Sequence, residues 1–387
     1  MPTLLFTGPG GAGTTTLAAA AAVRAARAGH RTVLVTRQDP PPGAATEPGL
    51  DVVRAEPQAE LEVLWGGWAA ELTATVPDLV LPPATSVVPV PGVGELAVLA
   101  ALGRVAGDRS GAPADLVVLD AGPLETAAGL LALPGTLRWW LEQAVPTRLR
   151  VLAAVRAAAV RTGTLRRGAA DVALGAVPAL EALLDRVTLT DPARTAVWLV
   201  APPRPGAVAG LHAATTAMAV HGQCPVGVLA RVLPEGGTGA WWAARAAEQE
   251  AALVALAGVA PVRTVAESAR VPEDADALAA LLTDLPGPAG SAEVPAPERV
   301  DGGWRLTLPL PFAERSGVAL TRWEDDLVVT AAGTRRSLRL DPLLRRCVVT
   351  AGSLADPGTA AARLEVGFAA DPQLWPADLL AAEGRTR

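Results

Sequence analysis

Four amino acids are absent from this 387-residue chain: lysine, asparagine, isoleucine and tyrosine. The 33 basic residues are therefore all arginines. The codons of the four missing residues are rich in A and T, so a genome of very high GC content explains their loss without reference to function. The chemical consequence is the same whatever the cause, because this chain alone cannot perform a reaction that depends on a lysine ammonium group.

Cysteine is also scarce, and acidic residues outnumber basic ones. Cys224 and Cys347 stand far apart in the sequence and match no disulfide framework or zinc motif. The net charge of -6 provides no overall basic field to hold nucleic acid or an anionic membrane. The opening residues MPTLLFTG carry no basic n-region, so we expect an unsecreted, cytoplasmic protein.

No transmembrane segment is expected. The longest stretch without a charged residue, residues 205–230, contains prolines, glycines and two histidines, which do not suit a spanning helix. We expect a helix there, then a turn and a buried strand. The length of the chain allows about two to three domains.

The N-terminal residues predict a βαβ unit. Residues 3–7 form a short apolar run, and a glycine-rich loop separates them from an alanine-rich helix over residues 15–28. Gly29 stands where a helix typically ends, and residues 33–36 read as a second buried strand. Two strands joined by a helix imply a parallel sheet. Further buried strands are expected at residues 115–120, 196–200 and 226–232, and residues 40–94 are expected to form helix fragments and loops.

The composition changes near residue 285. A segment rich in proline, glycine and alanine is followed by short alternating apolar runs between residues 304 and 368, which predict a small all-β sandwich. The predicted parts are an α/β domain over residues 1–284, a linker over 285–300, the β-sandwich over 301–369 and a tail over 370–387.

The strongest local motif is the loop between the first strand and helix. Its glycines let backbone N–H groups approach an anion, the helix N-terminus lies behind them, and the hydroxyl of Thr15 suits Mg²⁺. The candidate nucleotide-binding residues are Gly8, Gly10, Gly11, Gly13, Thr14, Thr15 and Thr16. Thr14 occupies the position where a phosphate-binding loop requires lysine, so a tight strand-to-helix connection is the structural alternative.

Several motifs together resemble the ArsA-type ATPase family, which is related to the MinD-like P-loop proteins. In order along the chain they are GPGGAGTTT, VLVTRQDPPPG, VVLDAGPLETAAGLLALPGTLRWWLE, LTDPARTAVWLV and VGVLARVLPEG. The C-terminal LTLPLPFAERSGVAL is similar to the small-heat-shock-like domain fused to some of these ATPases. The resemblance covers nearly the whole chain and implies a P-loop NTPase fold whose parallel sheet is flanked by helices.

The resemblance also assigns roles to individual residues. It implies that Asp39 organises the attacking water and Mg²⁺, that Asp120 is the Walker B carboxylate, and that Thr15 joins both at the metal. Asp39 and Asp120 are therefore the candidate catalytic residues, and Thr15, Asp39 and Asp120 the candidate metal ligands. Without the resemblance, an aspartate that ends a buried strand is as well explained by a turn or a helix cap.

The chain departs from the family pattern in four motifs. Pro9 and Thr14 replace the two lysines of the family loop GKGGVGKTT, one of which reaches across a dimer to the partner's nucleotide. Glu125 stands where the family has a flexible glycine, and Ala230 replaces the asparagine that reads adenine. Relaxed selection for catalysis explains these changes more simply than codon drift, which turns lysine into arginine.

Other candidates carry less information. Arg37 is a candidate for placing a guanidinium near a phosphate, but a solvated or ion-paired surface arginine is the simpler interpretation. Trp139 and Trp140 fit either an apolar client groove or ordinary helix packing. His212 and His221 belong to no motif and receive no role.

The sequence thus predicts a degenerate ArsA-type ATPase that acts as a binding, scaffold or client-handling protein. We expect weak Mg-ATP binding and no zinc or arsenite site. The expected partners are a second copy or an intact ArsA-type ATPase, or a hydrophobic protein client. The alternatives are an active ATPase with a rearranged site that uses Arg37, and a chaperone-like holder of hydrophobic segments.

Overall fold

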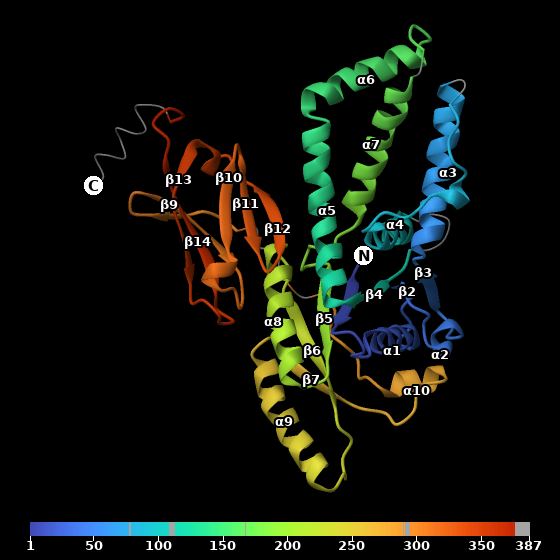
Figure 1. Ribbon diagram of the computed structural model, residues 1–387, viewed down its shortest axis with the longest axis vertical. Helices are drawn as coiled ribbons and strands as arrows, with labels where there is room; N and C mark the ends of the chain where they lie inside the picture. Colours follow the sequence, from blue (N-terminus) through green and yellow to red (C-terminus); the bar gives the residue numbers. More distant parts are fainter. Residues whose placement is uncertain (77–78, 108–112, 167, 289, 291–294, 376–387) are drawn as a thin grey trace. The chain divides into compact units, whose positions relative to one another are not determined.

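The computed structural model describes the chain except for residues 77–78, 108–112, 167, 289, 291–294 and 376–387. Seven strands of the described chain form one parallel sheet flanked by helices, and antiparallel sheets follow toward the C-terminus (Figure 1). The predicted fold class, an α/β sheet followed by an all-β part, is confirmed.

The large sheet is built from short apolar runs. Its strand order is β3-β2-β4-β1-β5-β6-β7. Parallel strands that are covered on both faces are apolar throughout, and β1, β2 and β5 are buried along their whole length. The strands are β1 (Thr3–Gly8), β2 (Thr32–Thr36), β3 (Leu50–Arg54), β4 (Leu116–Pro123), β5 (Thr195–Ala201), β6 (Pro225–Val232) and β7 (Val262–Ala266).

Contacts divide the chain into two compact units. Unit 1 comprises Met1–Leu189, Arg194–Ala196 and Ser268–Pro288, and unit 2 comprises Thr190–Ala193, Val197–Glu267 and Ala289–Arg387. The predicted domain limits stay a prediction, since parts of the linker (289 and 291–294) and of the tail (376–387) lie outside the described residues. The last three residues of the predicted linker form a strand, β8 (Glu298–Val300).

Unit 1 contains β1 to β4 and most of the helices. Figure 1 shows α1 on one face of these strands and α4 with α5 on the other, while α5 and α7 extend away from the sheet and are joined by α6. The helices of this unit are α1 (Thr14–Arg27), α2 (Pro42–Ala45), α3 (Pro57–Thr75), α4 (Val93–Gly107), α5 (Leu124–Ala144), α6 (Thr147–Arg161), α7 (Ala169–Arg186) and α10 (Ala275–Ala280).

Helix α1 shows how the sequence defines an element locally. Its alanines are small enough to lie flat against the sheet, and Ala18, Ala19 and Ala20 are fully buried. The helix ends because Gly29 adopts a φ of +93°, which residues with a Cβ rarely adopt. The N–H of His30 then donates to the carbonyl of Ala25, as in a Schellman motif.

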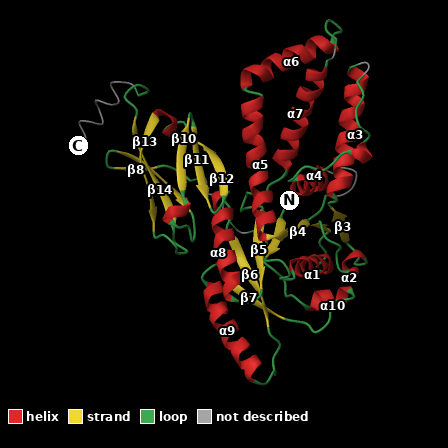
Figure 2. Cartoon of the chain, viewed as in Figure 1, coloured by secondary structure: helices red, strands yellow, loops and turns green. Residues whose placement is uncertain are grey.

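Unit 2 contains the remaining helices, α8 (Pro205–Val220) and α9 (Ala240–Ala257), and the small antiparallel sheets (Figure 2). One sheet has the order β10-β11-β12 and the other β13-β14-β9-β8. Inward residues of both sheets, including Leu306, Leu327 and Phe368, share one apolar core. Their bounds are β9 (Gly303–Pro309), β10 (Ala319–Trp323), β11 (Asp326–Ala331), β12 (Thr334–Arg339), β13 (Cys347–Ala355) and β14 (Arg363–Ala370).

The two histidines without a motif lie where α8 meets this β-structure. The ring of His212 stacks on Phe312 with 3.9 Å between ring centroids. The Nε2 atom of His221 lies 2.8 Å from the Thr334 hydroxyl, and Arg336 donates to the carbonyl of Val220. Both histidines therefore help to join helix and sheet within unit 2.

The pKa of His221 is lowered to about 4, first because burial penalises the charged ring and second because Arg336 repels it. The unfolded chain, with a histidine pKa near 6.5, takes up its proton earlier as the pH falls. Above about pH 6.5 the ring is neutral in both the folded and the unfolded chain, so His221 does not reduce the free energy of unfolding. As the pH falls from 6.5 toward 4, only the unfolded chain binds the proton, and the free energy of unfolding decreases.

We expect that the free energy of unfolding of the wild type falls by about 3 kcal/mol more between pH 7.5 and pH 4 than that of His221→Gln. Urea unfolding followed by tryptophan fluorescence at both pH values measures the difference. His30→Gln, at an exposed position, is the control and should behave like the wild type. Identical pH dependence in His221→Gln and the wild type would contradict the burial of a neutral ring.

Candidate functional site

The predicted phosphate loop connects β1 to α1. Gly8 is buried at the end of β1, whereas Gly10 and Gly11 are exposed. Gly11 and Gly13 have φ angles of +77° and +90°, so the backbone itself favours glycine at these two positions. A Cβ at Gly10 would meet no atom within 4 Å, so packing does not require glycine there. The loop thus keeps an open outer side at which backbone can approach a ligand.

The loop offers fewer donors than its glycines suggest. Pro9 has no N–H group, and its carbonyl accepts a hydrogen bond of 3.0 Å from the N–H of Ala12. The loop therefore closes on itself as a turn. Of the three threonines that follow, Thr14 is buried while Thr15 and Thr16 are partly exposed in the first turn of α1.

Asp120 is the centre of a hydrogen-bond network at the end of β4. Its Oδ2 atom accepts bonds from the hydroxyls of Thr15, at 2.7 Å, and Thr36, at 2.8 Å. Its Oδ1 atom accepts a bond of 3.1 Å from the N–H of Gly122, whose carbonyl accepts one from Thr7. The carboxylate is only 2 % exposed, and these donors replace the water it has lost.

The network brings together two of the three predicted metal ligands, Thr15 and Asp120. The hydroxyl proton of Thr15 is used on Asp120, which leaves the lone pairs of its oxygen available to a cation. Thr36 was missed by sequence reasoning, although a threonine at the end of the neighbouring strand was visible in the sequence. Its contact with Asp120 depends on the pairing of β2 with β4.

Asp39, the third predicted ligand, does not join this network. Its side chain is 83 % exposed and forms an ion pair of 2.5 Å with Arg54, which also contacts Glu56. The segment behind it is packed tightly, because a Cβ on Gly43 would lie 2.2 Å from the carbonyl carbon of Asp274. This close approach fixes α2 against the start of α10.

Two positions that depart from the family pattern, Glu125 and Ala230, and the candidate Arg37 have plain local environments. Glu125 lies exposed in the first turn of α5, where the helix dipole favours a carboxylate. Ala230 is buried within β6. Arg37 is 3.9 Å from Glu95, and a Cβ on Gly94 would lie 2.5 Å from its guanidinium carbon, so Arg37 is held against α4.

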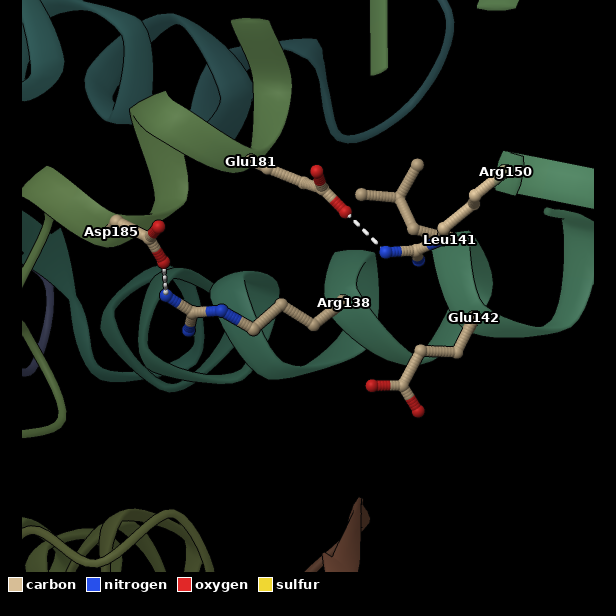
Figure 3. A pocket seen from close by; sticks show the side chains of 6 residues that line it. All are labelled: Arg138, Leu141, Glu142, Arg150, Glu181 and Asp185. Carbon is tan, nitrogen blue, oxygen red and sulfur yellow. Dashed lines mark hydrogen bonds and ion pairs between the residues drawn. The ribbon is translucent and has the colours of Figure 1, made fainter. Parts of the chain in front are cut away.

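A separate hollow of about 220 Å³ lies among α5, α6 and α7 (Figure 3). Two ion pairs occupy it, Arg138 with Asp185 at 3.3 Å and Arg150 with Glu181 at 2.6 Å. Glu142 also lines the hollow, so three carboxylates face two arginines and the lining has no excess of positive charge for an anionic ligand. It contains none of the predicted site residues. Trp139 and Trp140 lie on the same helix, edge to face at 5.0 Å, and Trp140 is exposed.

Neither a metal-binding cluster nor a membrane-spanning helix is present in the described part of the chain. No group of three or more histidine, cysteine, aspartate or glutamate side chains that could hold a metal ion occurs among them. Within the same part of the chain, no helix combines the length and apolar character needed to cross a membrane.

Comparison with known proteins gives matches at both ends of the chain. Residues 1–45 match the model of the anion-transporting ATPase family, and residues 301–358 match the HSP20-like domain found in ArsA. An uncharacterized Streptomyces coelicolor protein, SCO2128, is 36% identical over 97% of this chain and 99% of its own length. Protein Rv2184c of Mycobacterium tuberculosis is 30% identical over 89% of this chain and 84% of its own length.

Asp120 is buried in a hydrogen-bond network, whereas Asp39 is exposed, so the two aspartates should contribute differently to stability. Asp120→Ala removes the acceptor of two hydroxyls and one N–H group, and we expect it to lower the free energy of unfolding by about 3 kcal/mol. Asp39→Ala breaks an exposed ion pair and should cost less than about 1 kcal/mol. Urea unfolding followed by far-UV circular dichroism compares the two variants. Equal, small losses would show that the Asp120 network does not stabilise the fold.

Proposed function

Because this chain belongs to the ArsA family of anion-transporting ATPases and carries that family's HSP20-like domain, we propose that it is a binding or scaffold protein without appreciable ATP hydrolysis. The observation that carries the proposal is the absence of lysine from the whole sequence. Pro9 and Thr14 occupy the two loop positions where the family pattern has lysine.

The missing lysines remove the positive charge on which turnover depends. Phosphoryl transfer is catalysed mostly by positioning and by neutralisation of charge, and a cation supplied across an interface is typically worth about 10³ to 10⁵ in rate. Arg37 is the candidate to replace the cation of a loop lysine, but it is held against α4 beside Glu95. A chain that lacks both loop cations should therefore hydrolyse ATP near the background rate.

Weak nucleotide binding is compatible with the remaining residues. Thr15 and Asp120 supply the oxygen ligands that Mg²⁺ prefers, and they already lie together. In this proposal they hold the metal while the loop's N–H groups face the phosphates; the bound Mg²⁺ would supply charge neutralisation. Thr14 adds at most a neutral hydrogen bond, roughly half as strong as a charge-assisted one.

The exposed position of Asp39 also favours binding over hydrolysis. The carboxylate that would position a water is paired with Arg54 on the neighbouring strand, and Gly43 behind it is packed against Asp274. A rearrangement would have to break both contacts before Asp39 could act on a nucleotide. In the proposed role this segment is a fixed part of the surface.

The proposed partner is a second copy of this chain or an ArsA-type ATPase with an intact loop. In the family, one loop lysine acts across a dimer, and Pro9 cannot provide that contact. A relative with both lysines would supply the missing cations to a shared site. The proposal therefore favours a heterodimer in which this chain contributes surface and its relative contributes catalysis.

A second candidate function, holding a hydrophobic client segment, is favoured by the surface of α3. Val63 and Leu64 are 73 % and 60 % exposed, and Trp68 is 41 % exposed one turn further along. Apolar side chains gathered on one exposed helix usually mark an interaction site. This function requires no nucleotide chemistry and is compatible with the scaffold role.

The purified chain should release phosphate from saturating Mg-ATP no faster than its Asp39→Ala variant. The reason is that background turnover from a contaminating ATPase is identical in both preparations, whereas turnover by this site would depend on Asp39. The measurement is a coupled phosphate-release assay on both proteins. Turnover that disappears in the variant would establish the active-ATPase alternative and make Arg37 the first residue to replace.

A further inference from the structure

A local excess of positive charge is hidden by the net charge of the chain. Residues 143–170 contain six arginines and no aspartate or glutamate, although the whole chain carries a net charge of -6. Screening limits the effect of a distant charge to about 10 Å at moderate salt, so a local excess decides what binds locally. This segment includes the whole of α6.

Helix α6 also exposes its apolar side chains. Val151, Leu152 and Val155 are 60 %, 63 % and 64 % exposed, and no described residue of the helix is buried. Together with Arg148 they follow the spacing of three and four residues that places side chains on one helix face. The outward face of α6 is therefore apolar, with an arginine among its apolar residues.

The inward side of α6 is held by two arginines. Arg150 pairs with Glu181 at 2.6 Å, and Arg156 forms two hydrogen bonds to the carboxylate of Asp171, at 2.6 and 3.0 Å. Both acidic partners lie on α7. These contacts fix the orientation of α6, so its apolar face stays outward.

Three further arginines are exposed in this segment. Arg148 lies on the outward face, Arg161 is the last residue of α6 and Arg166 follows the helix; among the described residues none of the three is paired with a carboxylate. Figure 1 shows α6 crossing the ends of α5 and α7 that lie away from the sheet. Helix α6 therefore lies at the end of the α5–α7 extension that is remote from the sheet.

We propose that α6 docks this chain on an anionic phospholipid surface. Val151, Leu152 and Val155 enter the boundary between headgroups and acyl chains, and Arg148, Arg161 and Arg166 bind headgroup phosphates. A guanidinium can bind a phosphate through two hydrogen bonds, which suits arginine to this role. The docking is peripheral, and it depends neither on the nucleotide loop nor on the proposed loss of hydrolysis.

The combination of features favours a lipid surface over an acidic protein partner. The exposed apolar side chains lie on α6, and the exposed arginines lie on the same helix or directly after it; an interfacial helix needs apolar and basic side chains together on an accessible surface. A protein partner of matching shape is the competing outcome, and vesicles that contain no protein distinguish the two.

The first test is co-sedimentation of the full chain with vesicles of phosphatidylcholine, with or without an equal amount of phosphatidylglycerol. Replacing Arg148, Arg161 and Arg166 by glutamine should lower partition onto the anionic vesicles roughly a hundredfold. The matched control replaces Arg305, Arg315 and Arg335, three exposed arginines of unit 2, in the same way. That control should change binding little.

The second test addresses the apolar face. Leu152→Glu with Val155→Glu should abolish partition, whereas Val254→Glu, at a position 73 % exposed on α9, should not. Circular dichroism confirms that each variant is folded, and hydrogen exchange on the wild type should show protection within residues 147–166 when anionic vesicles are added. Protection confined to another segment would overturn the proposal.

The vesicle-binding results distinguish lipid docking from the alternatives. Binding to anionic vesicles that falls with salt and with both sets of α6 variants supports lipid docking. No binding to anionic vesicles, equal binding to both kinds of vesicle, or equal losses in the control variants would overturn it. The first of these results would leave the surface of α6 to a protein partner.

Discussion

The buried carboxylate of Asp120 is the charge around which the nucleotide-loop side of unit 1 is organised. A buried anion without partners costs several kcal/mol, so its three donors must be in place whenever the unit is folded. These donors come from α1, from the end of β2 and from the residues that follow Asp120 itself. The position of the loop relative to the sheet therefore depends on this single group.

This dependence would allow a nucleotide-type loop to persist in a chain without ATP hydrolysis, which is the role we propose. The residues that hold Asp120 are hydroxyls and a backbone N–H, whereas the cations of phosphoryl transfer act on the ligand and stabilise nothing in the fold. Lysines at positions 9 and 14 can thus be replaced without disturbing the carboxylate. Selection for structure and selection for turnover act on different atoms of one motif.

Local signals in the sequence predict the elements around the loop. The alanine run and Gly29 place the first helix at residues 15–28, and α1 spans Thr14–Arg27. Residues 50–54 are expected among helix fragments and loops, yet β3 forms there because Leu50 and its neighbours pair in parallel with β2. That pairing joins segments distant in sequence, and local periodicity carries no information about it.

In the candidate site, too, the sequence predicts local features but not the contacts between distant segments. A glycine loop followed by Thr15 is visible in the sequence, and so is an aspartate that ends a buried strand. The contact of Thr36 with Asp120, and the ion pair that holds Asp39 to Arg54, both require the positions of neighbouring strands. The sequence identifies the chemical groups, while the sheet decides which of them meet.

We propose that the missing loop cation, and not a disrupted fold, limits nucleotide binding. Calorimetric titration of Mg-ATP into the wild type and into Thr14→Lys tests it most directly. We expect weak binding by the wild type and at least about tenfold tighter binding by Thr14→Lys, because a charge-assisted bond replaces a neutral one. Equal affinities in two folded proteins would contradict the account.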